Sequence, residues 1–388
     1  MESVARVSEP DYRLLHGAAY AGLFIVGVYA AAFGPALEFI ADDRGVSLDT
    51  AGLMLTAFFI GSISASASVA MWLHGRDSRL LAAGGLALVV AGCLIVAVAP
   101  SFAGVLAGSA VLGLGDGLIV AALHILVANT SEDVAHGINQ LNLFFAVGAI
   151  CGPLWAGAVL ASSGSYPVVY TGIAVVTAAA MALMLVARSP AGHAGDVPDE
   201  PQPFRLSPTT LVMGTVLFLY VGAEFGLGSW VSAFARETAD AGVFGAAVLT
   251  AGYWGALMAG RMLSREWFRR SGDPAVLLLA SVAGAGVSSL VLAMASGSIG
   301  VSAMSAFGAG LCMGPVWPCV VAIVAAAGEN SSTAASVTMG NSGGVAIPWL
   351  QGRVLVGAGP SQGVFVTAAL CLLMFVITLG FRARRLAV

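Results

Sequence analysis

The sequence contains no lysine, and charged residues of either sign make up only 9% of its 388 positions. A soluble protein needs a much larger share of charge to cover its surface, so that class is excluded. The net charge of −4 gives no support for a nucleic-acid partner. The five cysteines lie in apolar stretches and none belongs to a Cys-x-x-Cys pair, so the sequence indicates neither a disulfide framework nor a zinc site.

Apolar residues, in contrast, make up 59% of the chain and gather in long runs. A run of about 20 apolar residues matches the hydrocarbon thickness of a bilayer. The sequence therefore predicts an all-α membrane protein, with lipid as its surroundings and twelve transmembrane helices. Their expected ranges are 14–40, 49–73, 80–98, 101–128, 136–161, 166–187, 209–235, 243–263, 274–296, 299–327, 333–357 and 361–382.

The two halves of the chain resemble each other. The run from Gly148 to Pro153 (GAICGP) recurs 195 positions later, from Gly343 to Pro348 (GGVAIP), and Gly113 has a counterpart at the same offset in Gly308. Apolar halves that repeat are typical of transporters, in which one half rocks against the other around a site between them. We therefore expect two pseudo-symmetric bundles of six helices each.

A polar stretch with five prolines, at 188–208, separates the halves. It predicts an N-terminal bundle at 1–187, a linker at 188–208 and a C-terminal bundle at 209–388. Most arginines fall on the side of the linker and of both termini, and the positive-inside rule places that side in the cytoplasm. We expect a multi-pass protein of the bacterial inner membrane, acting as a monomer.

Motifs in five of the expected spans point to one family. The fifth span carries Asn139, Gln140 and Asn142 ahead of Gly148, and the seventh reads YVGAE from Tyr220 to Glu224. Gly260-Arg261, the run GPVWP from Gly314 to Pro318, and the pair Gly343-Gly344 with Pro348 follow in spans eight, ten and eleven. This pattern resembles the major facilitator superfamily, and within it the fucose/proton symporters and their sodium-dependent glucose transporter-like relatives.

The resemblance implies the major facilitator fold and a site between the bundles at mid-membrane. It also shows departures. The first span has no acidic residue between Val28 and Gly34, and the position of the family's glutamate in span four is Val120 here. The family's glutamine in span five corresponds to Asn142.

Two intramembrane acids are the candidates for ion coupling. Asp116 lies near the middle of span four, with His124 two helical turns further along the same face, and Glu224 lies midway along span seven. A charge in the bilayer is costly, and acids retained there commonly carry protons or hold cations. A structural hydrogen bond from Asp116 to span one, a helix-capping or pairing role for Glu224, and an interfacial position for His124 are the alternatives.

Uncharged polar and aromatic residues are the candidates for substrate binding. Asn139 and Asn142 in span five and Asn341 in span eleven carry amides that suit the hydroxyl groups of a polyol. Trp230 could stack on a sugar ring beside Glu224, and Trp317 precedes a proline that would kink span ten. Hydrogen bonds between helices and ordinary core packing explain the same residues equally well.

Five charged residues are candidates for gating. Arg76, Asp77 and Arg79 lie in the loop between spans two and three, and Arg261 lies in span eight. Arg353, near the outer end of span eleven, would pair with an acid in the outer gate or bind an anionic group of the substrate. Topology anchoring and snorkelling to the membrane surface are the simpler accounts.

Together these features predict a secondary transporter that moves a small sugar- or polyol-like solute by alternating access, coupled to protons or sodium. A proton-coupled exporter of drugs or metabolites shares the same features. A transporter-like membrane sensor is the alternative from another class. No enzyme and no cofactor are expected, because the sequence shows no nucleophile–base set, phosphate-binding loop or metal cluster.

Overall fold

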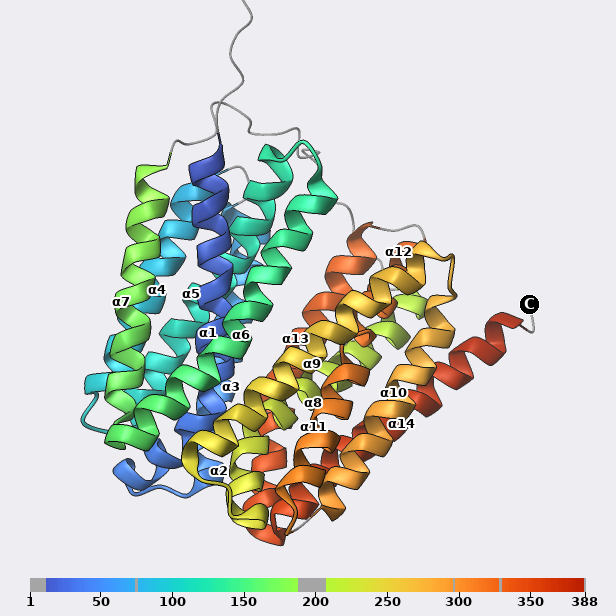
Figure 1. Ribbon diagram of the computed structural model, residues 1–388. Coiled ribbons are helices and arrows are strands. Elements are labelled where there is room, and N and C mark those ends of the chain that lie inside the picture. The colour runs from blue at the N-terminus through green and yellow to red at the C-terminus, as the bar shows by residue number, and fades with distance from the viewer. Residues whose placement is uncertain (1–11, 74–75, 188–206, 296, 328–329, 387–388) are drawn as a thin grey trace, which may run out of the picture.

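The computed structural model describes residues 12–73, 76–187, 207–295, 297–327 and 330–386, which form helices joined by short turns (Figure 1). In the first half α1 spans Arg13–Arg44, α2 Leu48–Ala51, α3 Leu53–Ser68 with a π-helical turn at Val69–Leu73, α4 Ser78–Val98, α5 Phe102–Thr130, α6 Val134–Ser163 and α7 Tyr166–Val186. In the second half α8 spans Pro208–Ala239, α9 Val243–Arg269, α10 Pro274–Met294, α11 Ile299–Met313, α12 Val316–Ala325, α13 Asn330–Ala358 and α14 Pro360–Leu386.

These helices form the twelve predicted transmembrane elements, and eleven of them are long and apolar enough to cross a bilayer. The element that falls short in hydropathy is α13, whose length would suffice but which is rich in serine, threonine, asparagine and glycine. The spans predicted at 49–73 and 299–327 are present, but each contains a helix break that was not predicted. Gly52 separates α2 from α3, and Gly314-Pro315 separates α11 from α12 because proline cannot donate a backbone hydrogen bond there.

The helices associate as two bundles, one from each half of the chain. In the first, α1 packs along α6 and α3 along α5, and in the second, α8 packs along α13 and α9 along α11. The repeated glycines explain this correspondence. A side chain at Gly148 would overlap the backbone carbonyl of Phe24 in α1, and one at Gly343 would overlap that of Phe218 in α8. Small residues allow helices to approach closely in lipid, where burial from water supplies no attraction.

Turn residues define where the helices begin and end. The side chains of Ser101, Asp133 and Ser207 accept hydrogen bonds from backbone N–H groups at the starts of α5, α6 and α8. Gly45 and Gly164 close α1 and α6 in the left-handed conformation that glycine adopts without strain. The 188–206 part of the predicted linker lies outside the described residues, so the predicted domain boundaries stay a prediction.

The bundles meet at one end of the molecule. We call the end at which α7 stops and α8 starts the linker end, and the opposite end the far end. The ribbons of the two bundles converge at the far end, near α2, and diverge towards the linker end (Figure 1). Contacts between α1 and α8, α3 and α13, and α6 and α9 join the bundles.

Candidate functional site

Asp116 is held inside the first bundle by two hydroxyl groups. Tyr29 of α1 donates a hydrogen bond to Asp116 Oδ1 over 2.8 Å, and Ser62 of α3 donates one to Oδ2 over 2.6 Å. Both oxygens of this partly buried carboxyl therefore have a partner, and neither partner is a cation. A carboxylate stabilised only by neutral donors can take up a proton without losing an ion pair, because the hydroxyl groups can rotate.

His124 lies apart from this group. Its Nδ1 donates to the backbone carbonyl of Val120 in its own helix over 2.7 Å, which fixes the ring. Asp116, Val120 and His124 do follow one another along one face of α5, as predicted. The histidine and the aspartate, however, do not share a hydrogen bond or a partner.

Glu224 forms the corresponding group in the second bundle, and it is 3% exposed. Arg261 of α9 donates from Nη2 to Glu224 Oε1 over 2.9 Å and to the Tyr220 hydroxyl over 3.4 Å. From α9, the Tyr253 hydroxyl donates to the backbone carbonyl of Glu224 over 3.0 Å. Arg261, predicted as a gating residue, is thus the partner of the acid predicted for coupling.

A layer of aromatic rings connects the two bundles beside these acids. Phe58 and Phe59 of α3 meet at 5.4 Å between ring centroids, and Phe59 meets Phe225 of α8 edge-on at 4.8 Å across the bundle boundary. Phe225 continues to Trp254 of α9 at 5.5 Å. We call Phe58, Phe59, Phe225 and Trp254 the aromatic layer.

Both acids lie on the same side of the aromatic layer. The α3 helix runs from the far end to the linker end, so Ser62, which binds Asp116, lies one turn beyond Phe58 towards the linker end. The α9 helix runs the same way, and Arg261 lies two turns beyond Trp254, on nearly the same helix face. Asp116 and the Glu224–Arg261 pair therefore face the end at which the bundles diverge.

The predicted substrate residues lie around this region, each with its own contacts. Asn139 and Asn142 are exposed on the linker-end half of α6, where Asn142 Nδ2 donates to the Ile138 carbonyl over 3.0 Å. Asn341 is partly buried on α13. Trp317, also partly buried, lies at the start of α12 with its ring 6.5 Å from that of Tyr220.

Trp230 occupies a different place. It is fully buried, and its indole N–H donates to the Pro348 carbonyl over 2.7 Å. Its ring fills the space above Gly52 of the first bundle and Gly352 of the second, so a side chain at either glycine would overlap it. In this conformation Trp230 is part of the far-end contact between the bundles.

Ion pairs close the far end around Trp230. Arg353 Nη1 of α13 binds Asp49 Oδ2 of α2 over 3.0 Å, and Arg236 of α8 pairs with Glu38 of α1. Both pairs join one bundle to the other. The structure thus places Arg353 against an acid of the opposite bundle, one of the two partners considered for it. Thr56 adds a hydrogen bond from α3 to the Val345 carbonyl over 2.6 Å.

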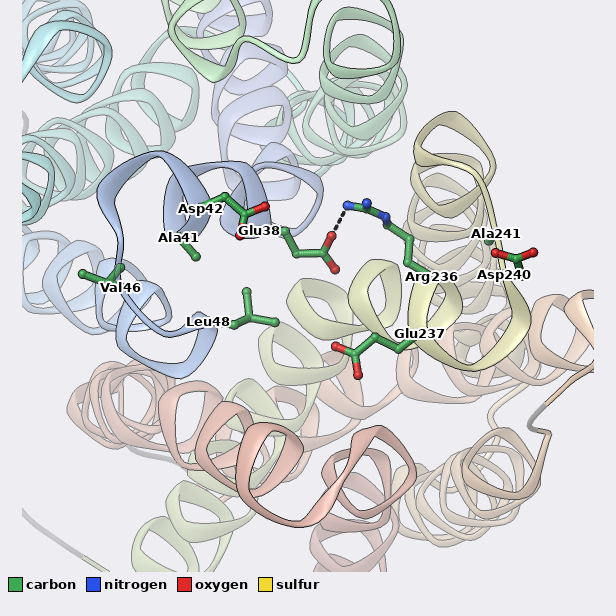
Figure 2. Close-up of a pocket in the computed structure, with 9 residues that line it drawn as sticks. All are labelled: Glu38, Ala41, Asp42, Val46, Leu48, Arg236, Glu237, Asp240 and Ala241. Carbon is green, nitrogen blue, oxygen red and sulfur yellow. Dashed lines mark hydrogen bonds and ion pairs between the residues drawn. The ribbon is translucent and has the colours of Figure 1, made fainter.

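We call the contacts of Trp230 and the two ion pairs the far-end seal. A pocket of about 430 Å³ lies beside it, at the Glu38–Arg236 pair (Figure 2). Figure 2 shows the Glu38–Arg236 pair in the pocket wall, with the carboxylates of Asp42, Glu237 and Asp240 around it. Four acids and a single arginine line the pocket, so its field is negative. Water that fills such a pocket reaches the ion pair directly.

The other predicted gating residues lie at the linker end of the first bundle. Arg76 is exposed, while Arg79 Nη1 donates to the carbonyls of Leu185 and Ala187 over 2.9 and 2.8 Å. Arg79 therefore caps the end of α7. Asp77 accepts from the backbone N–H groups of Arg79 and Leu80 at the start of α4. These four hydrogen bonds lie within the first bundle.

Several partners of the acids were not identified from the sequence as site residues. Tyr29, Ser62 and Tyr253 form hydrogen bonds to the two acids, and Tyr220 accepts one from Arg261. Glu38 and Asp49 complete the far-end ion pairs. Their common signal is a hydroxyl or an acid within two turns of the middle or the end of a helix. The internal repeat offered a further signal, because Tyr29 and Glu224 occupy equivalent positions 195 residues apart.

Comparisons with known proteins agree with this architecture. A sequence model of the Major Facilitator Superfamily matches residues 19–348, and no curated protein matches the sequence. Three solved structures illustrate the similarity of fold, each covering 95% of this chain. The nucleoside transporter NupG has 10% identity and a TM-score of 0.76 over 99% of its chain. The E. coli fucose:proton symporter FucP has 18% sequence identity and a TM-score of 0.63 over 98% of its chain. A POT family transporter in complex with 5-aminolevulinic acid has 13% sequence identity and a TM-score of 0.71 over 95% of its chain.

Proposed function

We propose that this chain, which belongs to the Major Facilitator Superfamily, moves a small sugar- or polyol-like solute through the membrane, coupled to protons or sodium. As a member of that family it is a membrane transporter and not an enzyme. The solute class and the coupling are our proposal. They derive support from the amides at Asn142 and Asn341 and from the two intramembrane acids.

One observation carries the proposal. Each bundle holds one carboxyl group near mid-helix, and both lie on the linker-end side of the aromatic layer, while ion pairs close the far end. A solute and an ion entering from the linker end would therefore reach both bundles at once and stop at the layer. Rocking of the bundles would break the Phe59–Phe225 contact and the ion pairs, and would open the opposite path.

The orientation is part of the same proposal. Arginines concentrate on the linker side, so the linker end faces the cytoplasm and both termini lie there, in a bacterial inner membrane. The described conformation would then be the inward-facing one. The molecule would work as a monomer, because the site lies between two bundles of one chain.

Transport by purified protein in sealed vesicles tests this function. A thermal-shift screen against sugars, polyols, amino acids and drugs, at two pH values with and without sodium, identifies binders first. Uptake of a labelled binder should exceed equilibrium when a proton or sodium gradient is imposed, and should fall to equilibrium when the gradient is dissipated. Solute movement in the direction opposite to the ion flow would indicate an exporter. Binding of a solute without any flux would indicate a sensor.

A further inference from the structure

Arg261 of α9 lies two turns beyond Trp254 of the aromatic layer towards the linker end, and it uses few of its donors. A guanidinium carries five N–H donors. Here Nη2 serves both Glu224 and Tyr220, and the buried Nε has no partner among the described residues. The side chain stays 26% exposed. The pair with Glu224 is thus made through one nitrogen and one oxygen. Both edges through which a guanidinium binds a carboxylate with two hydrogen bonds include Nη2, so Glu224 must release this nitrogen before another carboxylate can bind in that way.

From this geometry we infer that Arg261 binds a carboxylate of the solute and that Glu224 holds the arginine when no solute is present. The inference rests on the proposed transport function and refines its solute class to hydroxylated carboxylic acids, such as sugar acids. Planar forked donors recognise carboxylates with two parallel hydrogen bonds, which a neutral sugar cannot accept in the same way. The amides of Asn142 and Asn341 suit the hydroxyl groups of the same solute.

Charge balance links this binding to one proton. With Glu224 ionised, the pair is neutral overall and the charge of the arginine is compensated. When a proton binds a Glu224 carboxyl oxygen, the acid becomes neutral and Arg261 is left with an uncompensated charge in a largely buried setting, which is costly. A solute carboxylate restores neutrality. One proton and one carboxylate therefore enter together, and the charge of the site does not change.

The surroundings of Glu224 allow it to control this exchange alone. The titratable and charged groups that face it or its immediate contacts are Tyr220 of α8, Arg261 and Tyr253 of α9, and Cys371 of α14. Met313 of α11 contacts Tyr253, and Trp317 of α12 lies beside Tyr220. Ile347 and Gln351 of α13 pack against Gly222 and Gly226, two residues to either side of Glu224. Helix α1 approaches α8 through Gly34 at Ser229. Of these side chains, only the glutamate ordinarily changes charge at or below neutral pH.

Binding of matched acids and neutral sugars tests the inference. D-gluconate, D-glucuronate and lactate are compared with D-glucose and glycerol on the purified full-length protein, by thermal shift and calorimetry at pH 6 and pH 8. At least one carboxylate should bind about tenfold tighter than its neutral counterpart, and should lose up to about tenfold in affinity per pH unit as Glu224 ionises. Glu224→Gln should bind the carboxylate with no such pH dependence. Glu266→Gln, which changes a more exposed acid on α9, should behave as wild type.

The arginine is tested by Arg261→Gln, with the exposed Arg265→Gln as its matched control. Arg261→Gln should lose the preference for the carboxylate and Arg265→Gln should keep it. Because the single variant leaves Glu224 without its partner, the double variant Arg261→Gln/Glu224→Gln provides a neutral pair that should show the same loss. Wild-type carboxylate binding in both variants, pH dependence retained in Glu224→Gln, or no carboxylate bound by wild type at either pH would overturn the inference. Uptake of a neutral sugar alone would reject it while the transport function stands, and no gradient-driven uptake of any solute would reject that function too.

Discussion

Replacement of Asp116 by asparagine should separate solute movement from ion coupling. The asparagine keeps the shape of the side chain and one acceptor for the Tyr29 or Ser62 hydroxyl, but it cannot bind and release a proton. Neutral hydrogen bonds replace two charge-assisted ones, while the cost of a buried charge disappears, so the free energy of unfolding should change by no more than about 2 kcal/mol. The variant should therefore fold and bind solute.

The magnitude of the coupling follows from the number of acids. One proton moving down a gradient of one pH unit supplies about 1.4 kcal/mol, enough for about tenfold accumulation of a solute carried with it at zero membrane potential. If Asp116 and Glu224 each carry a proton, the limit is about a hundredfold. Asp116→Asn should remove one proton from the coupling and so lower the accumulation limit about tenfold per unit of the pH gradient. If Asp116 is the sole proton carrier, the variant should only bring the solute to equal concentrations on both sides.

Proteoliposomes with the potential clamped by potassium and valinomycin provide the assay. Accumulation ratios are measured for wild type, Asp116→Asn, and Asp133→Asn, an exposed aspartate that begins α6 and that asparagine replaces well as a helix cap. The exchange of labelled for unlabelled solute serves as the second readout and should persist in all three. An unchanged accumulation ratio in Asp116→Asn, at a proton or a sodium gradient, would refute the coupling role of this residue.

Two more predictions concern the far end and the packing of the bundles. Glu38→Gln with Asp49→Asn removes the ion pairs to Arg236 and Arg353, each contributing about 1 kcal/mol, and should raise the population open at the far end by about 30-fold. In a background without the native cysteines, the double variant should accelerate the alkylation of Ser229→Cys, since Ser229 is now only 3% exposed. The alkylation of Ser109→Cys, inside the first bundle, should not accelerate. An unchanged alkylation rate at position 229 would count against the far-end seal. Gly148→Leu should destabilise the protein by about 3 kcal/mol because the side chain overlaps the Phe24 carbonyl, whereas Gly84→Leu enters open space. Similar melting temperatures for the two glycine variants would contradict the proposed helix packing.

The fold was predictable from the sequence because the bilayer imposes it. The length of the apolar runs predicted the helices, and the structure confirms them. The repeated glycines at 148 and 343 predicted two matching bundles, and the structure confirms this too, since both glycines lie at equivalent close contacts between helices. The helix breaks at Gly52 and Gly314-Pro315 were missed, since hydropathy summed over a window does not detect a local loss of backbone hydrogen bonds. The polar α13 was predicted as a span although its hydropathy is low.

The site was predictable only in part. Asp116 and Glu224 stand out because acids are rare in such helices, and the alternative of a hydrogen bond from Asp116 to the first span is realised through Tyr29. Which groups would pair could not be derived from the sequence. Arg261 lies 37 residues from Glu224 on another helix, and the rotation of each helix about its axis decides whether they meet. Trp230 illustrates the same limit, because helix packing placed it in the far-end seal.

Distances across the two ends of the molecule test alternating access most directly. Spin labels at Asp42 and Asp240 report on the far end, and labels at Glu132 and Arg269 report on the linker end; all four residues are exposed. When a transported solute and its coupling ion bind, a population should appear in which the far-end distance lengthens while the linker-end distance shortens. Distances that stay fixed, or that lengthen together at both ends, would contradict the rocking of two bundles around one central site.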